Sequence, residues 1–222
     1  MNKSVYSLVL MDSIVDEIDK IAYMKNTSRS NVINQILADH LSYSTPEKKI
    51  SDIFDNLQSL INHSKNFQVI NQASPSMFSV KSSIKYKYKP TARYSVELYR
   101  NSNSVVGELK VSFRTQNTNL IDMLNGFFRL WSELEDKYIS KYFPGNKIER
   151  KIEDGRFTRI LILPLSENFR TNECIGQAIG EYIRMFDEIL KTYFSYADDI
   201  DTAREKVEQM YISYLKQGII IM

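Results

Sequence analysis

The first forty-odd residues predict one short strand and two short helices, a set of elements too small to close a hydrophobic core. Residues 5–10 read Val-Tyr-Ser-Leu-Val-Leu, a β-prone stretch with Tyr6, Leu8 and Leu10 on one face. A lone strand needs a partner strand, and the simplest partner is the same strand of a second copy, paired antiparallel across a two-fold axis. The sequence therefore predicts an obligate homodimer.

Two amphipathic helices are predicted to follow this strand. Asp12 or Ser13 is a natural N-cap for the first helix, which we expect to run to about Met24. Asn26 tolerates the left-handed conformation that ends helices, and Ser28 is the best N-cap for the second helix. The residues expected to face inward are Ile14, Ile18, Ile21, Ala22, Val32, Ile33, Ile36, Leu37 and Leu41.

This order of strand, cap, helix, Ser-rich restart and second helix resembles the ribbon-helix-helix (MetJ/Arc/CopG) superfamily, over about residues 3–43. The resemblance implies that a two-stranded ribbon enters the major groove of DNA, where the outward side chains of the strand read base edges. It also implies that the N-terminus of the second helix grips a phosphate. The residues assigned to DNA by this resemblance are Lys3, Val5, Ser7, Val9, Ser28, Arg29 and Ser30.

The predicted module departs from the superfamily in its charge and in its outer face. Val5 and Val9 cannot hydrogen-bond to bases, although they can touch thymine methyl groups. Residues 1–46 carry four Lys and Arg side chains against five Asp and Glu side chains, whereas DNA-binding modules are usually basic. A module that serves dimerisation alone therefore stays open as an alternative.

The rest of the chain predicts an α+β domain, an antiparallel sheet with long helices. A capping box at residues 44–47 starts a connecting helix over 45–66, and residues 71–80 are expected to form a loop. Asp154-Gly155 is the expected turn of a hairpin, and Thr202-x-x-Glu205 the expected start of a last helix. The apolar tail 219–222 is expected to pack as an edge strand or across a dimer interface. Strands are predicted at 84–89, 94–99, 107–113 and 158–163, and long helices at 118–140 and 172–196.

Residues 124–134 align with residues 179–189 without a gap, and each of these helical segments follows a predicted hairpin. The domain at 67–222 is therefore either a duplicated strand–strand–helix unit or a pair of amphipathic helices that match by chance.

A second candidate surface comes from the predicted strand at 84–89, whose alternation puts Lys85, Lys87 and Lys89 on one face. These lysines would supply secondary phosphate contacts. The alternative is an edge strand that its lysines protect from aggregation.

Enzyme, metal and cofactor chemistry have no residues to support them, so we expect no catalytic residues, no metal and no cofactor. His40 and His63 are the only histidines and Cys174 is the only cysteine. No P-loop, Gly-rich dinucleotide loop or nucleophile elbow is present. The chain has no apolar run as long as a membrane span and no cysteine pair, so we expect a cytoplasmic protein without a membrane partner.

The sequence thus favours a homodimer that binds double-stranded DNA sequence-specifically, a transcriptional regulator whose domain at 67–222 binds a small-molecule effector or a protein partner. A plasmid-partition or antitoxin-type adaptor would use the same module at 1–44. An assembly protein that does not bind DNA remains the alternative from another class.

Overall fold

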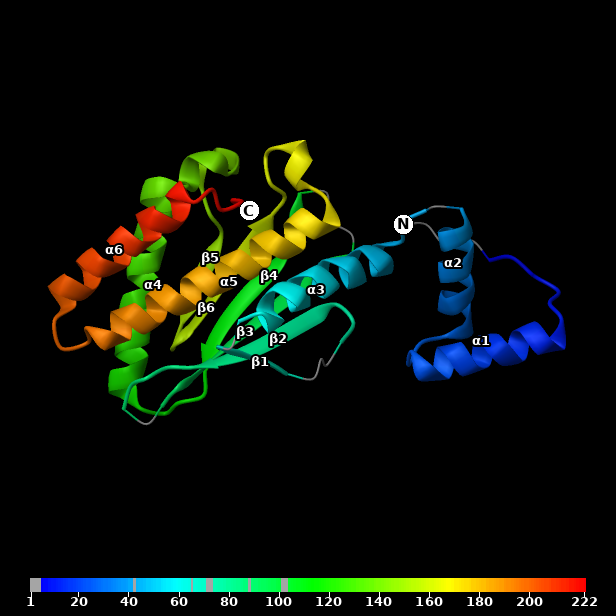
Figure 1. Ribbon diagram of the computed structural model, residues 1–222, viewed down its shortest axis with the longest axis horizontal. Coiled ribbons are helices and arrows are strands. Elements are labelled where there is room, and N and C mark those ends of the chain that lie inside the picture. Colours follow the sequence, from blue (N-terminus) through cyan, green and yellow to red (C-terminus); the bar gives the residue numbers. More distant parts are fainter. Residues whose placement is uncertain (1–4, 42, 65, 71–73, 88, 101–103) are drawn as a thin grey trace. The chain divides into compact units, whose positions relative to one another are not determined.

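The computed structural model describes residues 5–41, 43–64, 66–70, 74–87, 89–100 and 104–222. The chain divides into an N-terminal unit, residues 1–49, and a body, residues 50–222 (Figure 1). The body joins helices to an antiparallel sheet, so the expected α+β class is confirmed. Lys3 lies outside the described residues.

The N-terminal unit is a pair of helices, α1 (Asp12–Met24) and α2 (Arg29–His40), preceded by residues 5–11, which form neither helix nor strand in the single chain. The cap prediction for α1 was wrong, because Met11 occupies the N-cap position and no side chain caps the helix. The turn was predicted correctly: Asn26 is left-handed, with a φ of 47°, and the backbone N–H of Thr27 donates to the carbonyl oxygen of Ala22 at 2.9 Å.

Among the described residues of the body, six strands form one antiparallel sheet in the order β1-β2-β3-β4-β6-β5. The strands are β1 (Phe67–Ile70), β2 (Met77–Ser83), β3 (Thr91–Leu98), β4 (Val105–Phe113), β5 (Arg150–Glu153) and β6 (Arg156–Ile162). Side chains alternate along them, so that Ala92, Tyr94, Val96 and Leu98 of β3 are buried while their neighbours face outward. The sheet therefore has one covered face and one open face.

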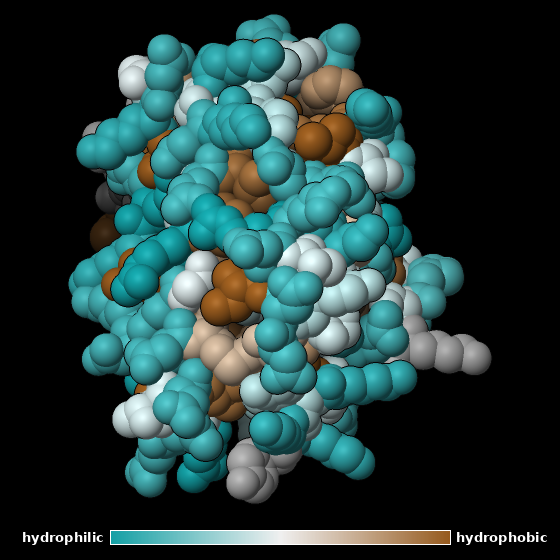
Figure 2. Space-filling view, turned by 90° about the vertical axis from the view of Figure 1, so that its left-hand side faces the viewer, coloured by the Kyte–Doolittle hydropathy of each residue, from teal (hydrophilic) through white to brown (hydrophobic). Residues whose placement is uncertain are grey.

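In the described part of the body, α3 (Pro46–Asn62), α4 (Thr118–Tyr138) and α5 (Asn172–Ser195) cover the buried face, and α6 (Ile200–Lys216) packs against α5 and α4 (Figure 1). Apolar side chains of α3 from Ile50 to Ile61 belong to the same core as those of the sheet. Phe186 of α5 lies at the centre, where its ring meets the rings of Trp131, Phe127 and Phe157. The surface seen in Figure 2, on the α6 side of the body, is mostly hydrophilic with scattered hydrophobic side chains.

The sequence located the hairpin β5–β6 and the two long helices α4 and α5 within a few residues. Asp154 and Gly155 both have positive φ, as their predicted turn requires. Other predictions were wrong. Strand β1 was missed, and β2 occupies the end of the loop expected at 71–80, of which residues 71–73 lie outside the described part. The last helix begins at Ile200 with Asp199 as its cap, and the tail 219–222 packs on the core without forming a strand.

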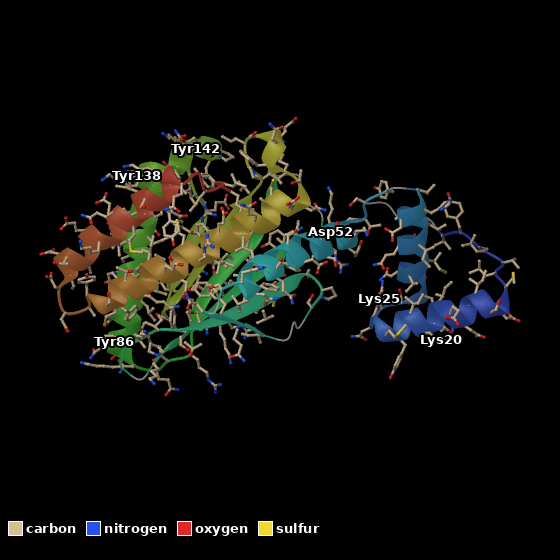
Figure 3. The ribbon with its side chains drawn as sticks, viewed as in Figure 1. Lys20, Lys25, Asp52, Tyr86, Tyr138 and Tyr142 are labelled. Carbon is tan, nitrogen blue, oxygen red and sulfur yellow. The ribbon has the colours of Figure 1, made fainter. Side chains whose placement is uncertain are left out.

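The lysine-lined strand predicted at 84–89 was wrong as well. Strand β2 ends at Ser83, and the backbone N–H of Ile84 donates to the carbonyl oxygen of Pro90 at 2.9 Å, which closes a loop. Pro90 has no N–H to continue the ladder, so the strand pair cannot extend through it. Tyr86, labelled in Figure 3, is half-buried against Phe194, and Lys89 is left-handed with a φ of 44°.

A buried polar network ties α4, α5 and β6 together. Arg159 is 1% exposed and its Nε donates to Oε1 of Glu135 at 2.7 Å. The hydroxyl of Tyr182 donates to the same oxygen at 2.9 Å and accepts from Nε1 of Trp131 at 2.8 Å. Nη1 of Arg159 donates to the carbonyl oxygen of Met222 at 2.6 Å, which fixes residue 222 on the core. The buried charges of Arg159 and Glu135 are paired with each other, as burial demands, and the second carboxylate oxygen of Glu135 lies 3.6 Å from Nη1 of Arg150 without a hydrogen bond.

Candidate nucleic-acid interface

Residues 5–11 form neither helix nor strand in the single chain, and their side chains are exposed. Val5 and Val9, the predicted outward residues, are 100% and 104% exposed, and Ser7 between them is exposed as well. On the predicted inward face, Tyr6 is 83%, Leu8 60% and Leu10 37% exposed. The inward leucines are thus partly covered by their own chain, while the outward valines touch nothing.

The N-terminal unit buries few apolar side chains of its own. Among its described residues, Ile18, Ala22, Val32 and Ala38 are the buried hydrophobic side chains. Many large apolar side chains of the same unit are exposed: Val5, Tyr6, Leu8, Val9, Leu10, Met11, Ile14, Tyr23, Met24, Ile36, Leu37, Leu41 and Tyr43. Monomeric soluble proteins rarely expose large apolar patches, so this density of exposed apolar side chains is unusual for a unit that stands alone.

The N-terminus of α2 presents free backbone donors. The hydroxyl of Ser28 accepts from the backbone N–H of Asn31 at 3.3 Å, which confirms Ser28 as the N-cap. The backbone N–H groups of Arg29 and Ser30 donate to no atom of the described residues. Free N–H groups and the positive end of the helix dipole favour an anion at this position.

The side chain of Arg29 is held by Asp19 of α1. Its Nη2 donates to Oδ2 of Asp19 at 2.5 Å, and its Nε donates to Oδ1. The hydrogen bond to Asp19 raises the pKa of Arg29 above its ordinary value. Both side chains are largely exposed, so solvent and salt screen the pair. A phosphate at the α2 N-terminus would compete with Asp19 for this guanidinium.

Other cations of the unit are also engaged with carboxylates. Lys20 pairs with Glu17 at 2.6 Å, and Lys48 pairs with Asp39 at 3.4 Å. Lys25, at the end of α1, is exposed (Figure 3), and Lys49 is exposed as well. The unit therefore presents little uncompensated positive charge, as its composition indicates.

The predicted secondary contacts Lys85, Lys87 and Lys89 lie in the loop between β2 and β3, where all three are exposed. The structure does not place them on one face of a strand. Their loop belongs to the body, whereas the ribbon residues and the α2 N-terminus belong to the N-terminal unit.

Sequence reasoning missed a row of cations on the open face of the sheet. The register pairs Lys81 with Arg93, Arg93 with Ser112, and Ser112 with Arg156, so three exposed cations follow one row across β2, β3, β4 and β6. The high local charge of residues 81–100 was visible in the sequence. The contribution of Arg156 depends on the strand order, which no local pattern reveals.

Within the described part of the chain, no group of three or more His, Cys, Asp or Glu side chains is placed to hold a metal ion. No helix there is both long and apolar enough to cross a membrane. No protein-family model, no curated protein sequence and no solved structure matches the chain. The arguments about function therefore start from these residues alone.

Proposed function

We propose that the protein is a homodimeric, sequence-specific DNA-binding protein, a transcriptional regulator whose residues 1–44 form a ribbon-helix-helix module. In this proposal, residues 5–11 of two copies pair as an antiparallel ribbon that enters the major groove. Val5, Ser7 and Val9 face the bases, and the N-termini of the two α2 helices hold phosphates.

The observation that carries the proposal is the incomplete core of the N-terminal unit. Among the described residues of this unit, four apolar side chains are buried, while thirteen large apolar side chains are exposed. Six of the thirteen belong to residues 5–11, which form neither helix nor strand in the single chain. The same segment of a second copy would pair with residues 5–11, and the dimer would cover exposed apolar side chains of the two helices. In that dimer, Val5, Ser7 and Val9 of both copies would lie on one outer face.

The free N–H groups of Arg29 and Ser30 support a phosphate clamp at each end of such a dimer. The bare valines favour contact with thymine methyl groups over hydrogen bonds to base edges. The module would then take its specificity from shape and methyl contacts, and its position from helix-end phosphate contacts.

Selection of bound duplexes from a random DNA pool tests this function directly. We expect enrichment of one motif with two-fold symmetric half-sites, because the dimer is two-fold symmetric. The enriched duplex should bind more tightly than a shuffled duplex at two salt concentrations. A stable dimer that enriches no sequence would refute DNA recognition while leaving the dimer intact.

An assembly protein that does not bind DNA is the second candidate, and the Arg29–Asp19 pair favours it. That pair and the acidic composition of residues 1–46 leave little charge for phosphate. A plasmid-partition or antitoxin-type adaptor is the third candidate. Tandem sites in the selected DNA would favour partition, and a single operator would favour a regulator.

The body supports a duplication as well. The strand order β3-β4-β6-β5 places the second strand of each β–β–α unit at the centre, antiparallel to its counterpart. The aligned helical positions Leu124 and Ile179 are buried, as are Trp131 and Phe186. We infer that β3–β4–α4 and β5–β6–α5 are repeats of one ancestral unit.

A further inference from the structure

The body contains a cleft of about 770 Å³ where β1 begins and β2 ends, open to solvent and bordered by α5. Its charged lining residues are Lys81, Lys85 and Lys191, and no acidic side chain is among the lining residues of the described chain. Hydroxyl groups of Ser83, Thr91 and Ser195 line the same cleft. The volume falls within the range of small-molecule sites, roughly 300–1,000 Å³.

Lys191 is fixed in position on the wall of this cleft. Its Nζ donates to Oδ2 of Asp187 at 2.6 Å and lies 6.0 Å from the centre of the Phe67 ring. Asp187 is buried and also accepts hydrogen bonds from the hydroxyls of Ser82, at 3.1 Å, and Tyr94, at 3.0 Å. Burial raises the pKa of Asp187, and the hydrogen bond from Lys191 opposes that shift. The ammonium therefore has a defined place and retains donors for a ligand.

The other two lysines supply uncompensated charge. Lys81 and Lys85 are exposed and form no ion pair with any described residue. Since Asp187 compensates Lys191 alone, the cleft carries an excess of positive charge beside several neutral hydrogen-bond donors. Such a lining suits the oxygens of a phosphate group, which are acceptors only.

We propose that this cleft binds a phosphorylated small molecule, which acts as a ligand of the body. Lys81 and Lys85 contact the phosphate oxygens, Ser83 and Thr91 supply hydroxyl donors from the same open face of the sheet, and Lys191 borders the cleft from the α5 side. The Phe67 ring beside Lys191 cannot hydrogen-bond, so the phosphate group of the ligand makes the polar contacts. The concave shape favours a small ligand over a nucleic-acid backbone, which is bound by extended surfaces. This site does not depend on the proposed DNA-binding function.

Titration calorimetry of the full-length chain with inorganic pyrophosphate tests the proposal. We expect saturable binding of one pyrophosphate per chain in the parent protein. The double variant Lys81→Gln/Lys85→Gln should bind at least about tenfold more weakly, because each substitution removes a charge-assisted contact. Lys87→Gln is the matched control, since Lys87 lies in the same loop, is exposed and does not line the cleft; its affinity should equal that of the parent.

Circular dichroism melting of all variants checks that their folds are intact, and the substituted side chains are exposed enough to make that outcome expected. Absence of saturable pyrophosphate binding would overturn the proposal. Equal affinity in the double variant and the parent would overturn it as well, as would equal losses in the double variant and Lys87→Gln. Loss of duplex DNA binding in the double variant, without pyrophosphate binding to the parent, would assign these lysines to DNA instead and refute a small-molecule site.

Discussion

Leu8→Ala should weaken the dimer, because Leu8 lies on the side of the predicted ribbon strand that we expect to meet the second copy. In the single chain, 60% of Leu8 is exposed and therefore still open to burial. The substitution removes three carbon atoms, worth about 2.4 kcal/mol in a fully buried site at about 0.8 kcal/mol per carbon. Scaled to the fraction that the partner would cover, the loss is about 1.4 kcal/mol per copy.

Two-fold symmetry applies this loss twice, so the dimer should be weaker by about 3 kcal/mol, or about a hundredfold in its dissociation constant. Sedimentation over a series of protein concentrations measures that constant. Val9→Ala is the control, because Val9 lies next in sequence, is 104% exposed and points away from the predicted partner. It lowers β-propensity in a similar way but should leave dimerisation unchanged. Equal dissociation constants for Leu8→Ala and the parent would refute the ribbon as the dimer seam.

Three further predictions follow from individual contacts. Asp19→Asn should strengthen binding to the selected duplex and Arg29→Ala should weaken it, because Asp19 competes with phosphate for that guanidinium; fluorescence anisotropy measures both, and parallel changes in the two variants would contradict the clamp. Glu135→Gln should lower the free energy of unfolding by about 3–5 kcal/mol in a urea titration, because it leaves Arg159 buried without its counter-charge; an unchanged midpoint would be inconsistent with the network. Gly107→Ala should lower the melting temperature sharply or prevent folding, because the added methyl group would overlap the backbone of β3; a parent-like melt would show that the sheet can adjust.

The helices could be predicted from the sequence because their signals are local. A period of 3.6 residues marks α4 and α5, and the caps at Ser28 and the turn at Asp154-Gly155 depend on neighbouring atoms alone. The loop at 84–90 could not be predicted in this way. Its alternating Lys and Tyr residues match a strand, but Pro90 ends the ladder and Tyr86 turns inward onto α5.

The candidate sites also differ in whether they depend on neighbouring residues or on long-range packing. The free donors at the start of α2 follow from a cap that the sequence displays. The Arg29–Asp19 pair joins residues ten positions apart on different helices, so it depends on how α1 and α2 pack. The lysine cleft depends on the strand register and on α5, which brings Lys191 to residues about a hundred positions earlier. Long-range geometry of this kind leaves no periodic trace in the sequence.

The scarcity of free cations in the N-terminal unit has a measurable consequence for salt dependence. The predicted DNA-contacting residues include two cations, Arg29, which the structure describes, and Lys3, which lies outside the described residues. A dimer would then neutralise between two and four phosphates, which predicts a slope of log K against log salt concentration between about −2 and about −4. Contacts from Lys85, Lys87 and Lys89 of both copies would make the slope markedly steeper. A slope near −8 would therefore show that the loop lysines reach the phosphates, whereas a slope near −2 assigns positioning to the ends of α2.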